Sequence, residues 1–125
     1  MEQVVGNYKL DKVPVQDMVE VAAAIASLAR VVCITRGSKG SLVLEGGAIT
    51  AVPAPAIRAV DSNGAGDMFA GAFLFAASHG YPHDQAALLA NRCAAAVVSQ
   101  HGNRLRPEQL LSLKAEFERE VGVPA

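Results

Sequence analysis

The chain has no tryptophan, only two tyrosines and four phenylalanines, and no apolar run that approaches the roughly 18 residues of a membrane span. It also has little net charge, −1 at neutral pH, with Lys and Arg scattered along the sequence. Nucleic-acid binding needs a basic surface and aromatic side chains on which bases stack, and both are scarce here. We therefore expect no nucleic-acid partner and no membrane partner.

Cysteine is scarce as well. Cys33 and Cys93 stand far apart in apolar stretches, without CxxC spacing and without a signal peptide. We expect two buried, reduced thiols and a cytoplasmic location. The three histidines, His79, His83 and His101, have no zinc-ligand spacing with one another or with the cysteines.

The composition that is present favours a globular protein. A length of 125 residues suits one domain, and 51% hydrophobic with 18% charged residues excludes a disordered tail. Much of the apolar content is alanine in helical stretches, which disfavours an all-β domain, and no heptad pattern is sustained long enough for a coiled coil. We expect residues 1–125 to form a single domain.

Hydrophobic periodicity predicts both strands and helices along the chain. Residues 1–12 show no clean period and are left unassigned. Helices are predicted over 15–30, 64–79, 83–101 and 107–121, strands over 31–35, 41–45 and 48–52, and a further extended segment over 57–60. Gly46 and Gly47 indicate a hairpin between the second and third strands. The predicted fold class is α/β, an open, largely parallel sheet with helices packed on it.

The most informative segment runs from Asp61 to Asp67, between a predicted strand and a predicted helix. Gly64 and Gly66 allow successive backbone N–H groups to point outward at the helix N-terminus, where the macrodipole helps to hold an anion. Asp67 would place a carboxylate base beside that anion. Gly, Asn and Asp also gather at helix starts for capping alone, so a structural role stays open on spacing alone. The spacing matches neither a P-loop nor a dinucleotide fingerprint.

DSNGAGDMFAGAF resembles the C-terminal signature of the ribokinase-like (PfkB) carbohydrate kinases, and Asn63 before the glycine is similar to their adenosine-kinase-like branch. ITRGSKGSLV resembles the strand and loop that lie along the ATP phosphates and ribose in that family. LANRCAAAVVSQHG resembles a late helix whose start, at Asn91, flanks the adenine. The resemblance extends along nearly the whole chain. It implies a ribokinase-like fold and ATP-dependent phosphotransfer to a hydroxymethyl group of a sugar or nucleoside.

The resemblance also implies roles for single residues. Asp67 is the catalytic base, and the anion hole is formed by the amides of Gly64, Ala65, Gly66 and Asp67. The nucleotide contacts are Thr35, Gly37, Gly40 and Asn91. The implied ions are Mg²⁺ and a monovalent cation such as K⁺, the latter held by Asp61, Asn63 and carbonyls around Val97, Gln100 and Gly102. Arg36 and Lys39 either touch a phosphate or are solvated loop residues.

Members of this family are much longer than this chain, and their acceptor contacts lie upstream of the matching region. Their N-x-x-E motif, associated with magnesium and phosphate, does not occur in residues 1–30. The resemblance therefore implies a C-terminal portion: a truncated gene product, an expressed piece, or one part of a split enzyme. We expect a missing N-terminal half or self-association. The alternative function is a non-catalytic nucleotide-binding or oligomerising fragment without an acceptor site.

Overall fold

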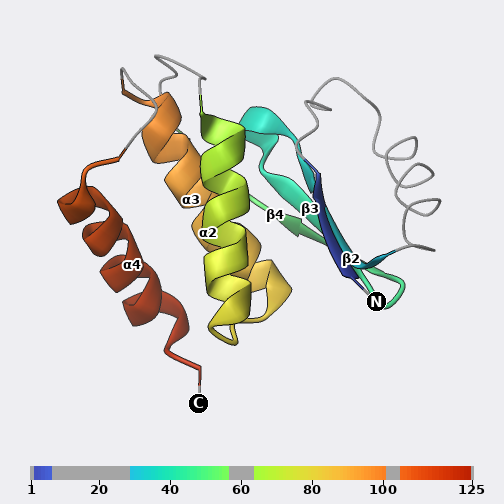
Figure 1. Ribbon diagram of the computed structural model, residues 1–125. Coiled ribbons are helices and arrows are strands. Elements are labelled where there is room, and N and C mark those ends of the chain that lie inside the picture. Colours follow the sequence, from blue (N-terminus) through green and yellow to red (C-terminus); the bar gives the residue numbers. More distant parts are fainter. Residues whose placement is uncertain (1, 7–28, 57–63, 101–104, 125) are drawn as a thin grey trace.

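The computed structural model describes residues 2–6, 29–56, 64–100 and 105–124 (Figure 1). Its strands form one sheet in the order β1 (Glu2–Gly6), β2 (Ala29–Thr35), β3 (Ser41–Glu45) and β4 (Ala48–Val52). β1 pairs with β2 in parallel, whereas β2 with β3 and β3 with β4 are antiparallel. The described part of the sheet is therefore mixed, and the largely parallel sheet stays a prediction for the whole fold.

Three helices follow the sheet, α2 (Ala65–Ser78), α3 (His83–Val98) and α4 (Pro107–Val121). Figure 1 shows α2 and α3 next to each other on one face of the sheet, with α4 on the side of this pair away from the strands. α3 contacts β3, β4, α2 and α4, so it is the central element of the helical layer. The predicted α/β class is confirmed.

The predicted strands agree with the structure except at the start of the chain. β3 and β4 have the predicted bounds, and Gly46 and Gly47 join them with φ of +59° and +80°, the left-handed values that a tight hairpin turn requires. β2 begins two residues earlier than predicted, at Ala29, because this end pairs with Glu2 of β1. β1 itself was not predicted, since its pairing with β2 is a long-range contact that short sequence patterns do not carry.

The predicted helices agree to within a few residues. α2 and α4 have the expected extents. α3 ends at Val98, three residues short of the prediction, because the N–H groups of Ser99 and Gln100 turn back to carbonyls within its last turn. The helix predicted over 15–30 is wrong at its last two residues, which belong to β2. Its remainder, 15–28, and the extended segment predicted over 57–60 lie outside the described residues.

The core lies between the sheet and the two central helices. β2 is buried on both faces along Val31–Ile34, as its continuous apolar run predicts. Against it pack Phe69, Phe73 and Ala76 of α2, which share one face of that helix. α3 buries mostly small side chains, and among the described residues no helix is long and apolar enough to cross a membrane.

Gly40 is the position where the loop between β2 and β3 meets the end of β4. Its φ is +89°, and a Cβ built on it would lie 2.0 Å from the carbonyl oxygen of Val52. Real Cβ atoms do not approach backbone so closely, so only glycine allows this contact. The loop residues Gly37–Lys39, the 3₁₀ turn η1, are held at this end of the sheet by that approach.

We predict that Gly40→Ala lowers the free energy of unfolding by about 3 kcal/mol, the sum of left-handed strain and overpacking. Gly47→Ala is the matched control, because Gly47 also has positive φ but has no atom within 4 Å of its added Cβ. That variant should lose only about 1 kcal/mol. Urea denaturation of both variants measures the difference, and equal losses would contradict the close-approach argument.

Candidate active site

The glycine-rich segment forms a helix start without a side-chain cap. Gly64 is the N-cap of α2 with φ +79°, and its carbonyl accepts the first helical hydrogen bond from the Met68 N–H at 2.9 Å. The N–H groups of Ala65, Gly66 and Asp67 have no hydrogen-bond partner among the described residues. Three amides without a partner among the described residues, at the positive end of a helix dipole, are the groups that the predicted anion hole requires.

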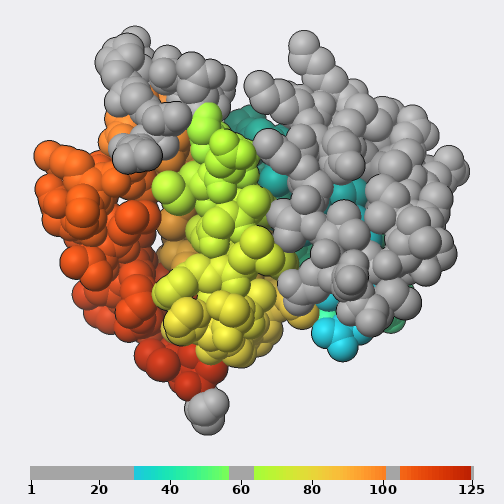
Figure 2. All heavy atoms as spheres, in the orientation of Figure 1, coloured from blue at the N-terminus to red at the C-terminus, as the bar shows by residue number. Residues whose placement is uncertain are grey.

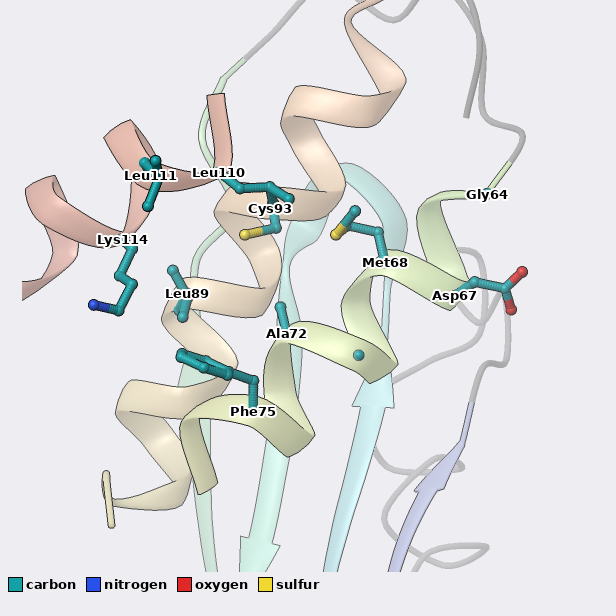
Figure 3. A pocket seen from close by; sticks show the side chains of 11 residues that line it. Gly64, Asp67, Met68, Ala72, Phe75, Leu89, Cys93, Leu110, Leu111 and Lys114 are labelled. Carbon is teal, nitrogen blue, oxygen red and sulfur yellow. The ribbon is translucent and has the colours of Figure 1, made fainter. Parts of the chain in front are cut away.

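Asp67 stands in the first turn of α2 with its side chain exposed. Figure 3 shows its carboxylate pointing away from Met68 and from the other labelled side chains. A carboxylate in this position can accept a proton from a hydroxyl group bound beside the free amides. The turn thus brings together the two predicted elements, the anion cradle and the base.

The predicted nucleotide loop joins β2 to β3. Thr35 ends β2, and the loop closes through a hydrogen bond from the Arg36 N–H to the Gly40 carbonyl at 2.7 Å. Gly37, with φ +58°, begins η1, and Gly40 packs against the backbone at the end of β4. In Figure 1 this loop and the first turn of α2 lie at the same end of the molecule.

Asn91 was predicted at the start of a helix, but it lies in the interior of α3. Its side chain is buried, and its Nδ2 donates to the Ser41 hydroxyl, the Val52 carbonyl and the Pro53 carbonyl at 3.1, 3.1 and 3.2 Å. The correction has a physical cause: helical periodicity continues upstream of Asn91 through Leu89 and Ala86, so α3 begins two turns earlier. The sequence reasoning did not identify Ser41.

Two further groups of predicted site residues are only partly described. Asp61, Asn63 and Gly102, predicted at a monovalent cation, lie outside the described residues. Val97 and Gln100 lie at the end of α3, where the Gln100 N–H donates to the Val97 carbonyl at 3.3 Å. The Nε of Arg36 is buried and has no hydrogen-bond partner in the described part of the chain, and the Lys39 side chain is exposed.

Comparison with known proteins identifies the family. Residues 7–109, well over half of the chain, match the sequence family described as pfkB family carbohydrate kinase. The chain belongs to this family. Over 83 residues it is 39% identical to adenosine kinase from Schizosaccharomyces pombe, and the match covers 58% of this chain and 24% of that protein.

Other pfkB relatives act on different acceptors, judged by their names. The chain is 39% identical over 77 residues to cytidine kinase from Thermococcus kodakarensis, covering 60% of this chain and 28% of that one. A probable sugar kinase from Rhizobium etli superposes with a TM-score of 0.73 at 30% identity, covering 80% of this chain and 31% of that one. The chain thus spans about a quarter of the length of the curated relatives it matches.

A groove of about 500 Å³ lies between α2, α3 and α4, and Figure 2 shows the surface hollowed between α4 and α2. Met68, Phe75, Cys93 and Leu110 line it with apolar surface, and Lys114 lies at its α4 side (Figure 3). The predicted nucleotide contacts are not among its lining residues. Met68 and Phe75 belong to the helix predicted over 64–79, but the sequence pattern did not indicate that α4 contributes to a groove with them.

Both cysteines are free and buried, as predicted. Burial raises the pKa of Cys93 to about 11. Burial also raises the pKa of Cys33 to about 12, although a hydrogen bond with Ser41 acts in the opposite direction. Both side chains are therefore neutral thiols in the folded protein at neutral pH, and neither is an activated nucleophile.

These thiols make stability fall at alkaline pH. An unfolded thiol loses its proton near pH 9.0, whereas the folded chain keeps the Cys93 proton to about pH 11. Between these values the unfolded state binds fewer protons, so the free energy of unfolding decreases as pH rises. We predict that Cys93→Ala makes this decrease shallower by about 1 kcal/mol per pH unit in urea titrations between pH 9 and 10.5. Parallel slopes for the two proteins would contradict it, since lysines and tyrosines titrate equally in both.

Proposed function

We propose that this chain is the ATP-binding, base-carrying part of a pfkB-family kinase that phosphorylates a hydroxymethyl group of a sugar or nucleoside. The observation that carries the proposal is the start of α2, where the amides of Ala65, Gly66 and Asp67 have no partner among the described residues and Asp67 stands in the same turn. The N-cap residue, Gly64, has no side chain with which to cap these amides. Residues 1–125 would form a single domain of the kinase.

Phosphoryl transfer needs positioning and charge stabilisation more than a strong base. In the proposed reaction the acceptor oxygen forms a bond to the γ-phosphorus of ATP while the bond from that phosphorus to the β,γ-bridging oxygen breaks, releasing ADP. The acceptor proton passes to the carboxylate of Asp67. The amides of Gly64, Ala65, Gly66 and Asp67 stabilise negative charge on the transferring group.

The nucleotide would lie along the loop that contains Thr35, Gly37 and Gly40, at the same end of the molecule as the anion cradle. Among the described residues no group of three His, Cys, Asp or Glu side chains could hold a metal ion. Mg²⁺ would be bound chiefly through the ATP phosphates, a common arrangement for this ion. Carbonyls near Val97 and Gln100, together with Asp61 and Asn63, would hold K⁺ beside the cradle.

The acceptor site would lie outside this chain. The relatives include adenosine, cytidine and probable sugar kinases, so their names support a nucleoside or a sugar equally. Because the chain spans about a quarter of the curated relatives, the residues that choose the acceptor would be supplied by the remaining part of the kinase fold.

The second candidate function, a non-catalytic nucleotide-binding or oligomerising fragment, is favoured by the surface of α2. From Met68 to Ser78 this helix has no charged residue. Leu74 and Phe75 are nevertheless 50% and 38% exposed. A helix that is apolar on all sides belongs in an interior. We infer that this face is covered by the N-terminal part of the kinase fold, or by a second copy where that part is absent.

We predict that, in a kinase that also contains the acceptor site, Asp67→Asn lowers turnover by about 10²- to 10⁴-fold, because the acceptor proton loses its base. ATP affinity should stay within about threefold of the unchanged protein, since the amides remain. Asp84→Asn is the matched control: Asp84 is the acidic residue in the first turn of α3 and belongs to no proposed site. Kinase assays with sugars and nucleosides, and calorimetry with ATP, measure the two quantities.

The outcomes separate the candidate functions. Unchanged turnover in Asp67→Asn would contradict its role as base. ATP binding by the 125-residue chain, with no turnover even when the remaining part of the kinase fold is supplied, would support the non-catalytic fragment. No heat with ATP or with any acceptor would contradict the nucleotide site itself.

We predict that the chain self-associates with rising concentration when nothing else covers α2, and that Leu74→Glu shifts it towards the monomer. Val123→Glu is the control, because Val123 is 70% exposed but lies outside α2. Sedimentation velocity over a concentration series measures the change. A monomeric unchanged chain throughout the series would contradict the need for a cover.

A further inference from the structure

The apolar core contains a small polar cluster that the proposed mechanism does not use. Asn91 and Ser41, 5% and 1% exposed, are the only buried polar side chains among the described residues. They come from α3 and from the first position of β3 and are hydrogen-bonded to each other. A buried amide is costly unless its hydrogen bonds are made, so this pair needs a reason to be there.

The bonds of Asn91 are directed at one point of the sheet. The atoms of Val52 and Pro53 that Asn91 contacts are both carbonyl oxygens, so the atom that faces them is Nδ2, the donor. Nδ2 has two hydrogens and three acceptors within 3.2 Å, all of them inside the protein. The Asn91 donor is therefore fully used by the fold and has none to spare for a ligand.

The nucleotide loop contacts the sheet at the same place, the end of β4. The Val52 carbonyl that accepts from Asn91 is the atom that a Cβ on Gly40 would meet at 2.0 Å. Ser41, the other partner of Asn91, directly follows Gly40 in the chain. Two groups that hydrogen-bond to Asn91 therefore hold the loop: Ser41, which follows Gly40 in the chain, and the Val52 carbonyl, against which Gly40 packs.

The anion cradle is connected to the same helix. α2, which begins at the cradle, packs along α3, and Phe69 and Phe73 of α2 share the core with Leu89 and Cys93 on either side of Asn91. α3 is consequently in contact with both halves of the proposed site, the cradle through α2 and the loop through Asn91.

We propose that Asn91 is a positioning residue for nucleotide binding, which sets the nucleotide loop against the anion cradle through Ser41 and Val52 without itself donating to the nucleotide. The inference rests on the proposed function, because it takes the loop and the cradle as the two ends of one nucleotide site. A positioning role and a direct contact make different predictions. In the positioning role, removal of the Ser41 hydroxyl also weakens ATP binding.

The test compares Asn91→Asp, Ser41→Ala and the double variant in the full 125-residue chain. Asn91→Asp keeps the shape but replaces the donor with acceptors that face two carbonyls. We expect the Kd for ATP, measured by calorimetry, to rise about five- to tenfold for Asn91→Asp and about threefold for Ser41→Ala. The double variant should be no weaker than Asn91→Asp alone, since both changes disable the same contact.

Glu120→Gln is the matched control, because it weakens the ion pair of Arg92, the neighbour of Asn91 on α3, with α4 at 2.6 Å. It should leave the Kd for ATP unchanged. Circular dichroism first establishes that each variant is folded at the temperature used. If Asn91→Asp does not fold, Asn91→Ala replaces it, with the same expected direction.

Each other result overturns the inference. Loss of ATP affinity in Asn91→Asp with none in Ser41→Ala, and additive effects in the double variant, would make Asn91 a direct contact. Lower urea midpoints with unchanged Kd in both would make the pair merely structural. If the unchanged chain binds no ATP, the proposed function fails and the positioning role fails with it, and this is distinguished by the first titration alone.

Discussion

The close packing of α3 is the constraint on which the rest of the structure depends. This helix meets the sheet, α2 and α4 at once, and it can do so because half of its buried positions are alanine. Ala86, Ala87 and Ala90 are completely buried. A larger side chain there would push α2 or the sheet away by more than the well-packed core tolerates. The distance between the anion cradle and the nucleotide loop follows from this packing.

Hydrogen bonds within this packing fix the position of α3 relative to the sheet. Apolar contacts between an alanine-rich helix and a sheet tolerate small sliding movements, whereas the hydrogen bonds of Asn91 to Ser41 and to the end of β4 have one arrangement. Gly40 adds a second restraint at the same carbonyl. The loop therefore has a defined place although its own residues are largely exposed.

The helix α2 has apolar side chains on two opposite faces. One of its faces is in the core with Phe69 and Phe73, and the opposite face exposes Leu74 and Phe75 beside a groove. Relatives in the pfkB family are about four times as long as the segment they share with it. An apolar outer face on the helix that carries the proposed base is consistent with a site that needs further chain to be complete.

The sequence by itself determined the features that local chemistry controls. Continuous β-branched residues predicted β2, paired glycines predicted the hairpin of β3 and β4, and the glycine turn with Asp67 predicted the start of α2 and its family. Tertiary structure alone decided β1, whose strand depends on pairing with β2, and the hydrogen-bond partners of Asn91. The resemblance implied that Asn91 contacts a nucleotide, whereas its side chain donates to the sheet, because residues 39 and 50 positions away in the sequence supply its partners.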